Sequence, residues 1–206
     1  MTSFKIYLPF VAAMALIVVA SNILVQYPFN HFGMQDVLTW GAFSYPIAFL
    51  VNDLTNRRYG KSAARRVVFA GFLIAVVLSV WLATPRIAIA SGTAFLTGQL
   101  LDIQVFDRLR RKSWWKAPFT ATIFGSILDT IIFFSLAFAS RFAFLDTMLG
   151  REDGSLSFAA PLFGMETPLW LTLAFGDLCV KVLMGVLALI PYGALLNVLR
   201  PVEAMR

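Results

Sequence analysis

The feature that most constrains this chain is a set of long apolar runs, each able to cross a lipid bilayer. A bilayer's hydrocarbon core is about 30 Å thick, and a helix of about 20 residues spans it. In one such run, residues 170–190, the only charged side chains are Asp177 and Lys181. We predict an all-α, polytopic membrane protein.

Six transmembrane helices are expected, in a single integral membrane domain that covers residues 1–206. The spans lie near residues 6–28, 39–55, 67–84, 87–106, 117–139 and 168–199. The second is short and contains Pro46. The longest connection, residues 140–167, is rich in aromatic side chains; it suits either a packed lid over an outer site or a mobile connector.

Composition agrees with this class and excludes others. The chain is 59% hydrophobic and 14% charged, whereas soluble domains are about 45–50% apolar and about 25% charged. This leaves no room for a soluble catalytic domain. The net charge of +6 could indicate nucleic acid, but the cations flank the predicted spans. The single cysteine, Cys179, excludes an internal disulfide and any multi-cysteine metal site.

The distribution of lysine and arginine predicts the orientation. Cytoplasmic loops carry an excess of these residues, and with six spans they collect on the side that holds both termini. That side has Lys5, Arg57, Arg58, Lys61, Arg65, Arg66, Arg108, Arg110, Arg111, Lys112, Lys116, Arg200 and Arg206, against Arg86, Arg141 and Arg151 on the other. Both termini are therefore expected in the cytoplasm. The alternative, that residues 5–20 are a signal peptide, would leave five spans and spoil the asymmetry.

Asp177 and Lys181 are the first candidates for function. A charge at the centre of a membrane helix costs roughly 2.5–3.5 kcal/mol on insertion scales, so intramembrane charges commonly mark a substrate or ion pathway. Trp170 shares their helical face. The alternative is that the two charges, four residues apart, neutralise each other and fasten the helix to its neighbours.

Asp129 lies near the middle of the fifth predicted span, beside Gly125, Ser126 and Thr130. Such small neighbours allow close approach of a helix or a ligand. No cation lies within one helical turn. Asp129 must therefore pair with Lys181 in space, bind something, or hold a proton.

The fourth predicted span carries Phe95, Gln99 and Asp102 on one face. Gln99 offers both a donor and an acceptor to a ligand, although an interhelical hydrogen bond is the alternative. Arg86 follows the cap Thr84 and Pro85, where a cation opposes the helix dipole. It is expected to pair with an acid, Glu166 or one in 140–167, or to contact a ligand near the entrance.

Two further segments are polar. Asn22 and Gln26 share a face in the outer third of the first span, a position that suits an outward-open pocket. At the end of the second span, Asp53 can pair with Arg57 and Gly60 can end the helix. For residues 52–60 we favour a structural role, with coupling or gating as the alternative.

The motifs of common enzyme classes do not occur in the sequence, neither a zinc-protease motif, nor a nucleophile elbow, nor a phosphate-binding loop. His31 is the only histidine. We expect no catalytic residue, no metal site and no cofactor.

Many short motifs together resemble the queuosine-precursor transporter family, also called the vitamin uptake transporter family. They are residues 21–22 with Gln26, 39–46, 53–55, Arg57, Gly60, 64–66, 86–88, 90–91, 98–102, 105–106, 114–115, 129–130, and Asp177 with Cys179, Lys181 and Val182. The resemblance covers nearly the whole chain. It implies an importer of the 7-deazaguanines preQ0 and preQ1 in the bacterial inner membrane. It also implies a six-helix fold similar to the substrate-binding subunits of energy-coupling-factor transporters.

A 7-deazaguanine is a flat base with an N1–H, an exocyclic amine and the acceptor O6. Carboxylates suit its donors, amide or cationic side chains suit O6, and aromatic rings can stack on its face. For base contacts we predict Asp129, Asp177, Gln99 and Asn22, with Trp170, Phe43 and Phe95 for stacking. Gln26, Arg86, Asp102 and Lys181 complete the predicted substrate site, with Lys181 favoured as a counter-charge.

The expected partners are this small-molecule base and membrane lipid, with no nucleic acid, and a homo-oligomer is left open. Two alternatives remain: a carrier for another flat purine-like or vitamin solute, and a structural membrane protein that transports nothing.

Overall fold

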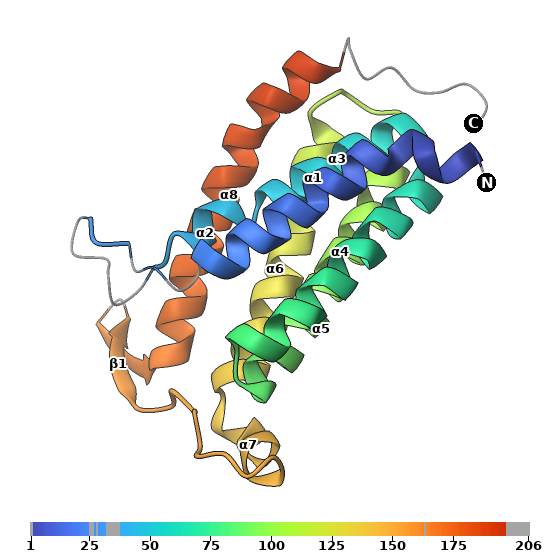
Figure 1. Cartoon of the computed structure of the whole chain (residues 1–206). Helices are drawn as coiled ribbons and strands as arrows, with labels where there is room; N and C mark the ends of the chain where they lie inside the picture. Colours follow the sequence, from blue (N-terminus) through green and yellow to red (C-terminus); the bar gives the residue numbers. More distant parts are fainter. Residues whose placement is uncertain (1, 25–26, 28, 32–37, 163, 197–206) are drawn as a thin grey trace.

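The computed structural model describes residues 2–24, 27, 29–31, 38–162 and 164–196. Seven of the elements form a helical bundle (Figure 1): α1 (Thr2–Leu24), α2 (Gly41–Ser44), α3 (Ile47–Tyr59), α4 (Lys61–Leu82), α5 (Pro85–Leu109), α6 (Lys116–Phe138) and α8 (Leu169–Leu195). Between α6 and α8 lie η1 (Ser140–Phe142), α7 (Phe144–Met148) and the antiparallel strands β1 (Ala159–Leu162) and β2 (Met165–Pro168).

Four helices are long and apolar enough to cross a membrane. They cover Ile6–Leu24, Lys61–Ser79, Lys116–Phe138 and Leu169–Leu195. The chain is therefore a largely helical, multi-pass membrane protein, with the β1–β2 hairpin as its departure from an all-α fold. The other two predicted spans correspond to α3, which is only 13 residues long, and α5, which is 25 residues long but less apolar.

The second predicted span, 39–55, is not one helix. Helix α2 ends at Ser44 and α3 begins at Ile47, so Tyr45 and Pro46 lie between the two. Proline has no N–H to continue the hydrogen-bond ladder, and its ring crowds the preceding turn. The break places the side chain of Tyr45 against the centre of the bundle, where it contacts Asp129.

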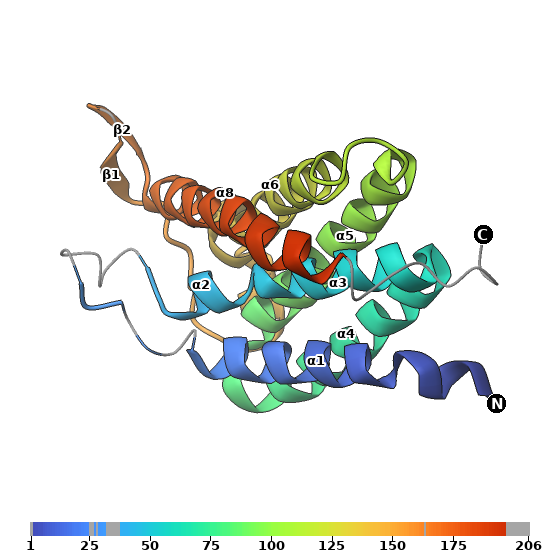
Figure 2. The ribbon, with the colours of Figure 1, turned by 90° about the horizontal axis from the view of Figure 1, so that it is seen from above.

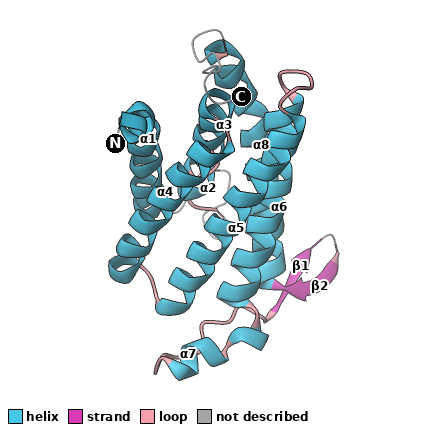
Figure 3. Ribbon diagram, turned by 90° about the vertical axis from the view of Figure 1, so that its right-hand side faces the viewer, coloured by secondary structure: helices cyan, strands magenta, loops and turns pink. Residues whose placement is uncertain are grey.

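The longest interface joins α5 and α6, and α5 also packs against α3 and α4. The views in Figures 2 and 3 show α1 and α4 on one side of the bundle and α6 with α8 on the other. Helices α5 and α6 meet at two glycines. A Cβ on Gly98 would lie 3.1 Å from the carbonyl oxygen of Gly125 and 3.0 Å from Cβ of Asp129. This close approach confirms the expectation from the small residues around Asp129.

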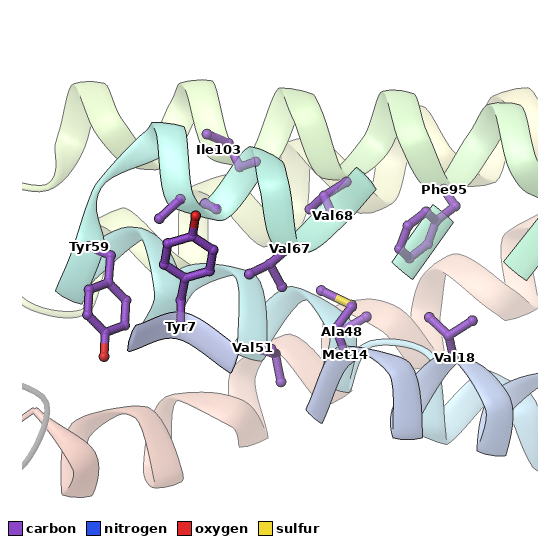
Figure 4. Close-up of a cluster of buried hydrophobic side chains, with 12 residues drawn as sticks. Tyr7, Met14, Val18, Ala48, Val51, Tyr59, Val67, Val68, Phe95 and Ile103 are labelled. Carbon is purple, nitrogen blue, oxygen red and sulfur yellow. The ribbon is translucent and has the colours of Figure 1, made fainter. Parts of the chain in front are cut away.

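A buried apolar cluster ties α1 to α3, α4 and α5 (Figure 4). Its larger members are Tyr7, Met14, Val18, Val51, Tyr59, Val67, Val68, Phe95 and Ile103. By contrast, large apolar side chains point away from the bundle on several helices, including Leu16, Leu73, Trp81 and Ile190. Such an apolar exterior is expected where the surrounding solvent is lipid.

The glycine contact predicts the effect of adding a side chain. A Cβ on Gly125 would lie 2.7 Å from the Phe49 ring and 3.1 Å from the carbonyl oxygen of Gly98. Gly125→Val should therefore destabilise the bundle by roughly 1–3 kcal/mol, because overpacked interiors cost about that much. Thermal unfolding in detergent measures the effect.

The matched control is Gly92→Val on α5. Its added Cβ would meet only one ring atom, of Phe72, at 3.3 Å. An equal loss of stability in both variants would contradict the proposed glycine contact.

Candidate functional site

Lys181 of α8 lies at the centre of a buried polar group. Its ammonium nitrogen is 2.6 Å from Oδ2 of Asp129 on α6 and 2.5 Å from Oδ2 of Asp177, one turn away on α8. It also donates to the hydroxyl of Thr130, at 3.1 Å. The predicted neutralisation of Asp177 by Lys181 is confirmed. So is the pairing of Asp129 with Lys181 across two helices.

Two further contacts complete this group. The hydroxyl of Thr130 donates to Oδ2 of Asp177 at 2.8 Å, and the hydroxyl of Tyr45 donates to Oδ1 of Asp129 at 3.3 Å. The ammonium of Lys181 also lies 5.6 Å from the ring centre of Tyr45, within cation–π range. We call Tyr45, Asp129, Thr130, Asp177 and Lys181 the Lys181 cluster.

The Lys181 cluster holds more acid than base. With every group ionised, two carboxylates face one ammonium. The side chain of Asp177 is 17% exposed, against 4% for Asp129 and 5% for Lys181. Asp177 is therefore the acid of this cluster with the most room for a further partner. A surplus carboxylate of this kind suits a cation or an N–H donor.

The ring of Phe95 adjoins the cluster through Tyr45. The two ring centres are 6.0 Å apart and the planes meet at 71°. Among the aromatic residues predicted for stacking, Phe95 has a ring contact in the structure with a member of the Lys181 cluster.

A second buried polar group lies where α3 packs against α5. It consists of Asn52, Asp53, Asn56, Gln99 and Asp102, which we call the Asp102 cluster; each is 1% exposed or less. The amide of Asn52 donates to Oδ2 of Asp102 at 2.9 Å and to the carbonyl of Gln99 at 3.3 Å. The structure thus places Gln99 and Asp102 together, but in a different cluster from Lys181.

The predicted pair between Asp53 and Arg57 is not found among the described residues. Asp53 points into the bundle, where its carboxyl lies beside that of Asp102. Arg57 instead donates to the backbone carbonyl of Arg110 at 2.6 Å. One helical turn separates the two residues, but they face different neighbours. The expected helix end at Gly60 is confirmed, with a positive φ of 82°.

The two clusters lie on either side of the contact between α5 and α6. Cβ of Asp129 lies against Gly98, and Cβ of Asp102 is 3.2 Å from where a Cβ on Gly125 would lie. The glycine pair thus brings both clusters close to one helix crossing. This arrangement allows a change at one cluster to be transmitted to the other.

Arg86 is buried in a network that holds the segment 140–167. Its guanidinium donates to Asp146 at 2.7 Å, to Ser155 at 3.1 Å and to the carbonyl of Ala139 at 2.6 Å. The predicted acid partner is thus in this segment, and it is not Glu166. Asp146 of this segment is buried against Arg86, whereas most of residues 147–159 are exposed, so the choice between a lid and a mobile connector stays open.

Asp153 also belongs to the Arg86 network, at 3.4 Å from the guanidinium. The hydroxyl and backbone N–H of Ser155 donate to its carboxylate and, with help from Arg86, lower the pKa of Asp153 below its usual range. Since Asp153 is exposed to solvent and Asp146 is buried, Asp146 is the main anchor.

For the other predicted residues that the structure describes, the contacts found are with residues outside the Lys181 cluster. The side-chain amide of Asn22 donates to the carbonyl of Val18 in its own helix. Phe43 packs against Phe29, and the backbone N–H of Trp170 donates to the carbonyl of Leu156 near the start of α8. Gln26 lies outside the described residues.

Five residues of the two clusters were not among the predicted site residues: Tyr45, Thr130, Asn52, Asp53 and Asn56. Tyr45 reaches Asp129 because the helix breaks at Pro46, and a proline inside a predicted span was the available signal. Asn52 binds Asp102 because α3 and α5 cross at that level, which no spacing in the sequence reveals.

Comparison with known proteins gives a consistent set of relatives. Residues 39–84 and 79–195 match a family described as "Putative vitamin uptake transporter". The chain is 37% identical to the "Queuosine precursor transporter" of Escherichia coli (strain K12), over 89% of this chain and 83% of the relative. It is 34% identical to the "Probable queuosine precursor transporter" of Haemophilus influenzae, with the same coverage of both chains. No solved structure gives a significant match.

The double contact of Lys181 predicts a large effect of its removal. Lys181→Met would leave two buried carboxylates without their cation, and breaking a buried pair costs about 3–5 kcal/mol. Adding Asp129→Asn to Lys181→Met should restore part of the loss. Thermal unfolding in detergent measures both variants.

Lys61→Met serves as the control for lost positive charge. Lys61 is largely exposed and its pair with Asp107 lies at the surface, where pairs contribute at most about 1 kcal/mol. Equal destabilisation by Lys61→Met and Lys181→Met would argue against the central position of Lys181.

The Arg86 network predicts how the segment 140–167 opens. Asp146→Asn should expose Arg151 to trypsin at least about tenfold faster, since loss of a buried ion-pair partner exceeds the 1.4 kcal/mol that a factor of ten represents. Asp153→Asn is the matched control. Because Asp153 is exposed, its loss should change the cleavage rate little, and equal rates in the two variants would refute the anchor role of Asp146.

Proposed function

The chain belongs to the vitamin uptake transporter family, and we propose that it imports queuosine precursors, the bases preQ0 and preQ1, across a bacterial inner membrane. Membership rests on the family match over most of the chain and on 37% identity to a curated transporter. The substrate class follows the names of these relatives. The observation that carries the proposal within the structure is the acid-rich Lys181 cluster at the centre of the bundle.

The chemistry of this cluster matches the base. A 7-deazaguanine presents an N1–H and an exocyclic amine side by side, and a carboxylate accepts from both. Asp177 and Asp129 supply such acceptors, 2.5 and 2.6 Å from one shared ammonium. The aminomethyl cation of preQ1 would further balance the surplus negative charge.

Each member of the cluster has a distinct role in this proposal. Asp177, the more exposed acid, accepts from the base, and Asp129 accepts from a second donor or holds Lys181 in place. The ammonium of Lys181 serves as counter-charge, and it donates to O6 only where the base replaces the hydroxyl of Thr130 as its third partner. The rings of Tyr45 and Phe95 cover an apolar face of the base. Stacking of a base on an aromatic ring contributes roughly 1–3 kcal/mol to binding.

A six-pass topology with both termini in the cytoplasm fits this function. In this proposal the chain crosses the membrane in α1, α3, α4, α5, α6 and α8, which belong to the bundle in Figure 1. The start of α1 and the end of α8 lie at one end, with most of the lysines and arginines, and the cytoplasmic side carries such an excess. The segment 140–167 and Arg86 then lie on the outer side.

The predicted residues outside the cluster are proposed for the route to it. Asn22, Phe43 and Trp170 belong to the outer part of this topology, and Arg86 holds the segment 140–167 over that side. A role for Gln26 stays a prediction from the sequence. We propose that this segment is a lid that opens for substrate entry. Self-association into a homo-oligomer stays a prediction.

Uptake in cells tests the proposal. In bacteria that lack their own importer and cannot make the base, expression of the wild-type chain should restore uptake of labelled preQ1. Asp129→Asn and Asp177→Asn should each lower uptake at least tenfold, because an amide replaces a carboxylate that accepts from the base. Membrane protein levels are measured in parallel.

Asp107→Asn is the matched control, an acid at the far end of α5 whose partners are Lys61 and Arg110. It should leave uptake nearly unchanged. If the wild-type chain restores no uptake and the purified protein binds neither preQ0 nor preQ1, the proposed function is wrong.

A further inference from the structure

The Asp102 cluster contains more hydrogen-bond acceptors than donors. One side-chain oxygen in each of Asn52, Asp53, Asn56, Gln99 and Asp102 is buried without a partner in the described structure. Buried polar atoms are nearly always bonded. The surplus of acceptors therefore indicates that the cluster needs a further hydrogen-bond donor. Both side-chain amide atoms of Gln99, in the same cluster, also have no partner among the described residues.

The two acids of this cluster face each other. Asp53 and Asp102 are both buried, and one carboxyl oxygen of each has no partner among the described residues. Thr122 on α6 lines the same small cavity as Asp53. Two carboxylates are both acceptors, so they can bond only through a proton held between them. Like charges in contact in a dry interior cannot both be ionised without a large cost.

No described cation neutralises this pair. Arg57 on α3 and Arg110 at the end of α5 donate to each other's backbone carbonyls, and Arg110 also pairs with Asp107. On α8, Lys181 is held by its own two acids. One shared proton would lower the negative charge of this pair from −2 to −1.

A small cavity beside Asp53 has room for a water molecule that could accept this proton. The space is about 10 Å³ and its walls include Asp53, Thr122 and the hydroxyl-bearing ring of Tyr192, which is just enough for one water. The Tyr192 hydroxyl is buried and unpartnered among the described residues. A water there would accept the proton from Asp53 as a hydronium ion, which passes the proton on towards the cytoplasmic side, and two carboxylates would remain.

We propose that Asp53 and Asp102 share one proton and that this pair couples import of the base to the proton gradient. The coupling rests on the proposed function, because it needs a transported base in the Lys181 cluster. The glycine contact joins the two sites, since Asp129 lies against Gly98 and Asp102 against Gly125. Release of the proton separates the acids, shifts α3 against α5, and so alters the neighbouring Lys181 cluster.

Transport by the full chain in proteoliposomes tests the coupling. The probe is labelled preQ0, which is neutral, with the membrane potential clamped at zero and a pH-sensitive dye in the lumen. An acidic exterior should drive accumulation, and addition of preQ0 should acidify the lumen; a sodium gradient should do neither. Accumulation that follows sodium, or that ignores the pH gradient, overturns the proposal.

Asp53→Asn isolates the proton. Its amide N–H can replace the shared proton in the bond to Asp102, so the fold should persist. Accumulation driven by the pH gradient should fall at least tenfold, while exchange of internal for external base continues. Asp107→Asn is the matched control and should retain accumulation. Unchanged accumulation in Asp53→Asn contradicts the proposal.

An infrared measurement tests the shared proton without any base. Purified wild-type protein should show the carbonyl band of a protonated carboxyl that shifts in heavy water. The band should vanish in Asp53→Asn and in Asp102→Asn and persist in Asp107→Asn. If the band is absent from the wild-type protein, the shared proton is refuted. If the band is present but the wild-type protein does not exchange preQ0, only the proposed function is refuted.

Discussion

The bond of one lysine to two acids on neighbouring helices is the interaction on which the centre of this protein depends. Lys181 meets Asp177 on its own helix and Asp129 on α6 at 2.5 and 2.6 Å. A charge in a membrane interior is costly unless it is paired, so α6 and α8 cannot separate here without exposing an unpaired charge. The same pairing leaves a carboxylate in surplus, which is what a base rich in N–H donors requires.

Helix α5 connects three polar sites along its length. Arg86, near its start, holds the segment 140–167; Gly98 packs against Asp129; and Gln99 with Asp102 faces α3. This explains why α5 is less apolar than the other long helices, since its polar side chains face protein rather than lipid. In the proposals above, the lid anchor, the substrate site and the coupling site therefore all contact this one helix.

The sequence predicted the membrane class, the approximate limits of most helices and the isolated charges that matter. Asp129, Asp177 and Lys181 were recognisable because charges in apolar runs are rare, and the local absence of a cation near Asp129 indicated a partner elsewhere in the chain. Contacts across helices were less accessible. The predicted partner of Asp53 was wrong. The i,i+4 rule pairs Asp53 with Arg57, whereas helix packing turns the Asp53 side chain towards Asp102. Tyr45 was missed because only the break at Pro46 brings it to Asp129.

The central claim is that the base binds in the Lys181 cluster, and a structure of the purified protein with bound preQ1 tests it most directly. The account predicts density for the base between α6 and α8 beside Tyr45, with a ring N–H within hydrogen-bonding distance of Asp177 or Asp129. Density for the base elsewhere, with the contacts of Lys181 to both acids unchanged, would contradict it.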